Sequence, residues 1–153
     1  MGYYVHIEDS NVMLPTKHYE LAYMRMCALN KHDELKRGGS STGEKWFSWM
    51  DPNYDLVCKT AQDILVELGF DVEEQDDGLV IYAYDNKSGQ EELFLEAISD
   101  LLRTIHNENS PENKPFIVWR GEDDMVWKDI YGEKNVKSLS GRIVFEESEI
   151  GGQ

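Results

Sequence analysis

Basic side chains are scarce in this chain of 153 residues. It carries 15 Lys and Arg residues against 30 Asp and Glu residues, a formal net charge of −15 at pH 7. A surface this negative repels phosphate backbones and anionic membranes, and it attracts basic surfaces. The charge therefore argues against direct binding of nucleic acid or of a membrane and favours a basic protein partner.

Cysteines and long apolar runs are also scarce. Two cysteines make no disulfide framework, so Cys27 and Cys58 are predicted to be reduced core residues, with a disulfide between them as the alternative. No stretch reaches the roughly 18 apolar residues that span a bilayer. Residues 1–9 lack the positive lead and apolar run of a signal peptide. Together these absences predict a cytoplasmic protein.

The hydrophobic content is sufficient for a packed core. Hydrophobic residues make up 41% of the chain, and eight Tyr, five Phe and four Trp are among them. Each aromatic side chain can bury roughly 150–250 Å². The length fits a single domain, predicted over residues 1–147, with a frayed tail at 148–153.

Periodicity and turn signals predict an α+β fold with a mainly antiparallel sheet and three helices, in the order β-α-α-β-β-α-β-β-β. Asp51-Pro52 begins the clearest helix, whose apolar face runs from Val57 to Leu68 and which Gly69 ends. The Asp77-Gly78 turn between two β-rich runs predicts a hairpin. The predicted helices are 16–30, 52–68 and 90–105, and the first has an apolar stripe made of Tyr19, Ala22, Tyr23, Met26 and Leu29. The predicted strands are 3–7, 70–73, 79–84, 116–119, 125–131 and 136–139 with 142–145. Trp119 and Trp127 bracket an acidic turn and are predicted to pair across two strands, with a protein-binding hot spot as the alternative.

Negative charge is concentrated between residues 71 and 100. Ten acids and one base, Lys87, give this segment a net charge of −9. The hairpin tip and the outer face of the third helix are predicted to share one negative field. Residues along a strand are about 3.3 Å apart, close to the 3.4 Å between charges of one DNA strand, so a row of carboxylates can imitate a row of phosphates. A solvated face that only keeps the protein soluble is the alternative.

The predicted partner-binding side chains are all acidic and come from the hairpin, the third helix and a later turn. They are Asp71, Glu73, Glu74, Asp76, Asp77, Glu91, Glu92, Glu96, Glu122, Asp123 and Asp124.

A second hypothesis is a small-anion or nucleotide site. Lys36 and Arg37 precede two glycines that allow close backbone approach to an anion, and Trp46 and Trp49 follow as stacking surfaces. The loop lacks the spacing of a phosphate-binding motif, so a mobile loop beside core tryptophans is the alternative.

A metal-dependent hydrolase built on clustered carboxylates is the third hypothesis. The four histidines are scattered without a dedicated metal spacing, and the acid pairs fall in predicted turns, where water keeps carboxylates ordinary. The sequence predicts no catalytic residue, cofactor or resident metal.

Three strings carry a resemblance. Lys36-Arg37-Gly38-Gly39-Ser40, Trp46-Phe47-Ser48-Trp49-Met50 and Trp119-Arg120-Gly121-Glu122-Asp123 resemble small acidic, uncharacterised proteins of bacterial and phage genomes. The resemblance brings no activity and no catalytic residue. In size and charge the chain is also similar to small acidic phage proteins that block host defences. The leading expectation is a non-enzymatic protein that docks on a basic, nucleic-acid-binding protein and competes with nucleic acid for it.

Overall fold

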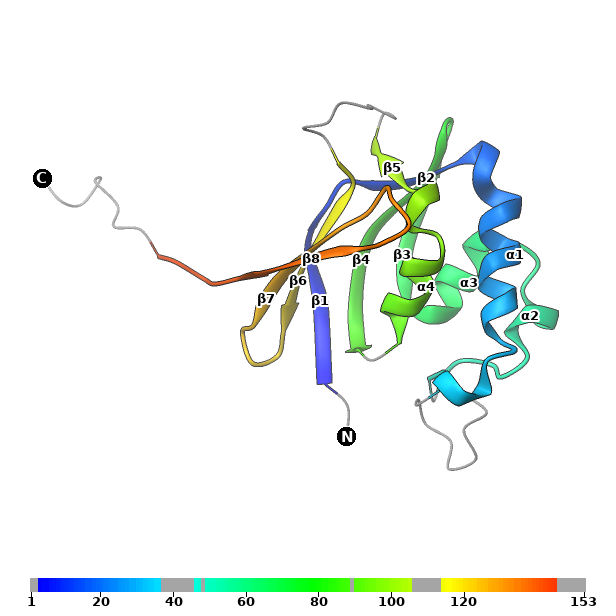
Figure 1. Ribbon diagram of the computed structural model, residues 1–153, viewed down its shortest axis with the longest axis horizontal. Helices are drawn as coiled ribbons and strands as arrows, with labels where there is room; N and C mark the ends of the chain where they lie inside the picture. The colour runs from blue at the N-terminus through cyan, green and yellow to red at the C-terminus, as the bar shows by residue number, and fades with distance from the viewer. Residues whose placement is uncertain (1–2, 37–45, 48, 89, 106–113, 146–153) are drawn as a thin grey trace, which may run out of the picture.

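Eight strands in the described part of the chain form one antiparallel sheet, and the helices gather on one side of it (Figure 1). The computed structural model describes residues 3–36, 46–47, 49–88, 90–105 and 114–145. The strand order is β5-β2-β4-β1-β6-β7-β8, and β3 pairs with β4 off this path. The α+β prediction is therefore confirmed. The strands are β1 (Tyr3–Ser10), β2 (Val12–Pro15), β3 (Phe70–Gln75), β4 (Gly78–Ser88), β5 (Arg103–Thr104), β6 (Phe116–Gly121), β7 (Val126–Ile130) and β8 (Lys137–Gly141).

Strands β1 and β2 follow each other along the long strand β4. Tyr3 lies opposite Ser88 at one end, and Pro15 lies opposite Gly78 at the other. The chain bends at Asn11, whose side-chain Oδ1 accepts a 2.7 Å hydrogen bond from the Phe116 amide and whose carbonyl accepts one from Ile105. Before this bend β1 also pairs with β6, and after it β2 also pairs with β5. The sequence prediction missed both β2 and β5.

Four α-helices are described: α1 (Tyr19–Leu29), α2 (Tyr54–Val57), α3 (Ala61–Leu68) and α4 (Glu91–Ala97). The predicted stripe of the first helix is confirmed, with Ala22 and Met26 fully buried. The predicted helix 52–68 is wrong in its continuity, because the chain leaves helical geometry at Cys58. Thr60 then caps α3 by accepting a 3.1 Å hydrogen bond from the Asp63 amide.

Two further boundaries differ from the prediction. The third helix ends at Ala97, a 3₁₀ turn covers Ser99–Leu101, and the next residues pair with β2 as β5. The last strand is β8 alone, since residues 142–145 are not a strand and Phe145 is 92% exposed. Val57, predicted on the apolar face of the second helix, is also exposed.

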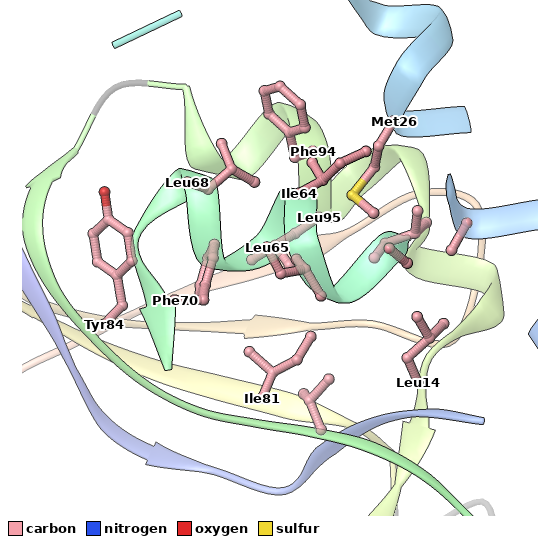
Figure 2. Packing of buried hydrophobic residues seen from close by; sticks show 14 of the residues in the cluster. Leu14, Met26, Ile64, Leu65, Leu68, Phe70, Ile81, Tyr84, Phe94 and Leu95 are labelled. Atoms are coloured by element: carbon pink, nitrogen blue, oxygen red, sulfur yellow. The ribbon is translucent and has the colours of Figure 1, made fainter. Parts of the chain in front are cut away.

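The core lies between the sheet and the helices (Figure 2). Leu14 and Ile81 contribute from the sheet, Ile64 and Leu65 from α3, and Phe94 from α4, and all are buried. Because inward-facing residues alternate with outward-facing ones along a strand, the pattern of β6 buries Ile117 and Trp119. The predicted cross-strand pair of Trp119 and Trp127 is confirmed by the register of β6 and β7.

Both cysteines are free thiols. Cys58 is buried and Cys27 is partly exposed, and burial raises the pKa of each thiol, that of Cys58 to about 11. Among the helices that the structure describes, none combines the length and the apolar character that crossing a bilayer requires.

Candidate functional site

The β3–β4 hairpin carries five of the predicted partner-binding acids. Asp71, Glu73, Glu74, Asp76 and Asp77 are all exposed. Strand β3 pairs with β4 along its whole length, and the Thr16 amide donates a 3.2 Å hydrogen bond to the carbonyl of Asp77 at the tip. Gly78 allows this approach, since a Cβ there would lie 2.5 Å from the Leu14 carbonyl oxygen. The hairpin is therefore a firmly held support for these carboxylates.

No ion pair within the described residues involves any of these five carboxylates. Two of these acids, Glu74 and Asp77, act electrostatically on Tyr19. Tyr19 lines a hollow of about 350 Å³ together with Thr16, Glu74, Gln75 and Asp76. Burial raises the pKa of the Tyr19 phenol, and the charges of Glu74 and Asp77 raise it further. The hairpin thus presents a negative surface that forms no ion pair with the described bases.

Helix α4 places its acids in two directions. Glu91 is 3% exposed and accepts a 2.9 Å hydrogen bond from the Ser88 hydroxyl, so it lies inside the molecule, away from a partner. Glu92 and Glu96 are exposed and, four residues apart, share one helix face. That face looks onto β7 and β8, where the two carboxylates line a pocket.

This pocket, which we call the α4–β7 pocket, has a volume of about 180 Å³. Its lining residues come from α4, from β7 and the residue after it, and from β8 and the residue before it. Period-two alternation along β7 turns Trp127 and Asp129 toward α4, and Ser138 lies directly opposite Asp129 on β8. The lining residues are Glu92, Glu96, Trp127, Asp129, Tyr131, Val136 and Ser138.

Electrostatics within the α4–β7 pocket are strongly perturbed. Burial raises the pKa of Asp129, which is 8% exposed, while Ser138 and Trp119 partly offset that rise. Desolvation also raises the pKa of Glu92, helped by the charges of Glu91, Asp129 and Glu96. Burial raises the pKa of the Tyr131 phenol well above its ordinary value. The pocket therefore brings three carboxylates together, and water screens the charge of the buried one, Asp129, poorly.

The third acidic group, at the β6–β7 turn, is engaged in holding the turn. The Tyr3 hydroxyl donates a hydrogen bond to Asp123, which raises the pKa of Tyr3 to about 12 and lowers that of Asp123. Glu122 accepts a 3.0 Å hydrogen bond from the Tyr4 amide. Asp124 adopts a left-handed φ of 64° and accepts a 2.8 Å bond from Arg120. These three carboxylates serve local structure.

The sequence predicted that the acids of the hairpin and of the third helix share one negative electrostatic field. The structure instead separates these two groups of acids. Glu92 is influenced by Glu96 and Asp129, whereas the hairpin acids Glu74 and Asp77 act on Tyr19. In the strand order β7 lies four strand spacings from β3, about 19 Å along the sheet at about 4.8 Å a strand. Salt screens exposed charges over about 8–10 Å. The hairpin and the α4–β7 pocket are therefore two separate negative surfaces.

The side chains predicted for an anion site are engaged elsewhere. Lys36 is 6% exposed, and its Nζ donates to the Asn30 carbonyl at 3.0 Å and to Asp33 at 2.7 Å. Trp46 is buried against Phe94, with Lys36 Nζ 5.8 Å from its ring centroid. Trp49 stacks on Phe47 with ring centroids 4.4 Å apart. Arg37 lies outside the described residues, so the anion-site hypothesis gains no ligand-facing group from the others.

The described residues contain no group of three or more His, Cys, Asp or Glu side chains placed to hold a metal ion. His6 does pair with Glu8 at 2.9 Å, as their placement on one strand face indicated, and His32 pairs with Glu34 at 3.0 Å. Each is a pair on an exposed surface. The hydrolase hypothesis therefore has no metal centre in this part of the chain.

Reasoning from the sequence named Glu92 and Glu96 but missed the other side of the α4–β7 pocket. A usable signal was present: Trp127, Asp129 and Tyr131 alternate along one strand, so an acid shares the buried face with two aromatic residues. An acid at such a position must lie at a pocket or be held by buried donors.

Comparison of the chain with protein-family models gave no match, and searches of the curated proteins and of the solved structures gave none either.

Proposed function

We propose that this protein is a non-enzymatic acidic interaction protein, and that its β3–β4 hairpin docks on the basic surface of a nucleic-acid-binding protein. The observation that carries the proposal is the group of five exposed hairpin carboxylates, which have no ion-pair partner among the described residues. A group of this kind attracts a basic groove over long range and speeds encounter with it.

The geometry of the hairpin supports competition with nucleic acid. Asp71 and Glu73 stand two residues apart on one strand, about 6.6 Å at the usual rise, and the tip adds Asp76 and Asp77. Lys and Arg side chains spaced to meet successive phosphates would meet these carboxylates as well. Binding would then exclude nucleic acid from the groove and inhibit the partner.

The test is displacement of a labelled DNA duplex from purified basic proteins that bind duplex DNA. The wild-type chain is expected to displace the duplex at about 0.1 M salt and to lose most of this effect near 1 M, where the screening length falls from about 10 Å to about 3 Å. A chain that displaces the duplex from none of these proteins, or does so equally well at both salt concentrations, contradicts the proposal.

Two variants of equal charge change locate the surface. The hairpin variant Asp71→Asn/Glu73→Gln/Asp76→Asn should weaken displacement about tenfold, at about 0.5 kcal/mol for each lost pair. The control variant Asp9→Asn/Glu20→Gln/Glu133→Gln removes three exposed acids on other elements and should change it little. Equal losses in the two variants would show that net charge alone acts, without a hairpin site.

A further inference from the structure

Asp129 is a buried carboxylate at the wall of a pocket, and no described base forms an ion pair with it. Taking a carboxylate out of water is costly unless a cation or several donors meet it. Two more carboxylates, Glu92 and Glu96, line the same pocket from α4. The pocket therefore has the charge of a cation site without a cationic side chain in the described residues to fill it.

We propose that the α4–β7 pocket binds a guanidinium group, with Asp129 as its buried anchor and Trp127 as its stacking wall. A guanidinium is planar and weakly hydrated, stacks on aromatic rings and donates two parallel hydrogen bonds to a carboxylate. Trp127 is partly buried and lines the pocket beside Asp129 on the same strand face. An ammonium group, compact and strongly hydrated, uses such an aromatic wall less well.

The volume agrees with this ligand. At about 180 Å³ the pocket is slightly larger than a cavity of about 150 Å³ that holds benzene, a ligand of six heavy atoms. A guanidinium with one or two methylene groups has about the same number of heavy atoms. Glu92 and Glu96 are exposed, so they lie where an incoming cation first meets the protein.

A second observation comes from Trp119, which is 2% exposed and whose indole Nε1 forms no hydrogen bond with the described residues. Trp119 lies opposite Trp127, and Ile117 lies opposite Asp129, so the indole shares one face of β6 and β7 with the Asp129 carboxylate. An unsatisfied buried donor is unfavourable, and a carboxylate is a stronger acceptor than a neutral carboxyl. A bound guanidinium would keep Asp129 ionised and give the Trp119 N–H a charged acceptor.

The guanidinium can come from an Arg side chain of a partner or from a small free guanidine. An Arg side chain of a partner as the source rests on the function proposed above, in which the partner is basic. Binding of a guanidinium by the pocket does not depend on that function. The pocket would then add short-range selection for Arg to the long-range attraction of the hairpin.

The first arm of the test uses a small probe. N-acetyl-arginine amide is titrated into the protein while the indole N–H signals are followed by NMR, with N-acetyl-citrulline amide as the neutral probe of the same shape. The arginine probe should shift the Trp127 signal, and the citrulline probe should bind at least tenfold more weakly. The variants Asp129→Asn and Trp127→Leu should each lower affinity for the arginine probe at least tenfold, whereas Asp9→Asn, a matched loss of charge, should leave it unchanged.

The second arm identifies the source with an arginine-rich peptide. A loss of peptide affinity in Asp129→Asn assigns the pocket to a partner's Arg side chain, and unchanged peptide affinity with loss of the small probe assigns it to a free guanidine. If Asp129→Asn alters neither and unfolds cooperatively like the wild type, the inference is overturned. That result would leave the hairpin proposal intact, because the hairpin variant tests it separately.

Discussion

Arg25 of α1 donates a 2.5 Å hydrogen bond from Nη1 to Oδ1 of Asp100, in the 3₁₀ turn that follows α4. The same nitrogen also donates to the Ala97 carbonyl at 3.2 Å, where α4 ends. Both side chains are about a third exposed or less. This contact fixes α1 against the end of the helix that forms one wall of the α4–β7 pocket.

The Arg25–Asp100 contact should stabilise the fold in a pH-dependent way. The hydrogen bond from Arg25 lowers the pKa of Asp100 in the folded state below 3.8. The stabilisation is therefore present above pH 3.8 and is lost as the pH falls through the pKa of the folded state. Asp100→Asn should lower the free energy of unfolding by about 1 kcal/mol at pH 7. Urea unfolding at pH 7 and pH 3 tests this, and a deficit that persists unchanged at pH 3 would contradict it.

Asp129→Asn should act in the opposite sense. The pKa of Asp129 is raised above 3.8 in the folded state, so the folded protein holds this proton more tightly than the unfolded chain does. The free energy of unfolding therefore falls as the pH rises above 3.8 and through the pKa of the folded state. Removing the charge should raise the melting temperature relative to wild type at pH 7 and leave it unchanged at pH 3. Thermal unfolding followed by circular dichroism measures both, with Asp9→Asn as the control. A lower melting temperature at pH 7 would mean that Ser138 and Trp119 stabilise the carboxylate fully.

Thr60→Ala distinguishes a broken helix from a continuous one. Because Thr60 caps α3 through the Asp63 amide, its loss should cost about 1 kcal/mol, and Thr60→Ser should cost less. If helix 52–68 were continuous, Ala at position 60 would stabilise the protein, since Ala is the best helix former. The sign of the change in unfolding free energy therefore decides between the two structures.

Lys36→Met tests whether the buried ammonium is structural. The apolar stem is retained, but the Asn30 carbonyl loses its 3.0 Å donor and Trp46 loses a cation near its ring. Leaving such a buried acceptor unsatisfied should cost about 1–3 kcal/mol. Denaturant unfolding followed by Trp fluorescence measures the change. If the variant is as stable as wild type, the buried ammonium is not structural, and this outcome would favour the hypothesis that Lys36 binds an anion.

Local signals predicted the elements that local chemistry determines. The Asp77-Gly78 turn identified the hairpin, Gly69 ends α3 at a φ of 112°, and the apolar stripe identified α1. Each depends on residues close together in the sequence, and each is confirmed.

The missed elements depend on distant partners. β2 and β5 have four and two residues, and they are recognisable only through pairing with β4 and with each other. The break after Val57 is held by tertiary hydrogen bonds, from Tyr23 to the Cys58 carbonyl at 2.6 Å and from Tyr54 to the Met26 carbonyl at 2.7 Å.

The sequence predicted only the part of the candidate site that local composition reveals, because the rest depends on residues distant in the sequence. Charge density identified the hairpin acids and the exposed side of α4, because composition along the chain is visible in the sequence. The strand register that sets Asp129 opposite Ser138 and beneath α4 depends on the order of the strands in the sheet. A pocket between α4, which ends at Ala97, and β7, which begins at Val126, follows only from that order.

The central position of β1 limits when the protein can fold during synthesis. Tyr3 pairs with Ser88, and Val5 pairs with Gly121, so the first strand joins neighbours made much later. Contacts between such distant residues slow folding and leave strand edges exposed meanwhile. Strand β1 must therefore wait, unpaired, until residues 85–88 and 117–121 have emerged from the ribosome.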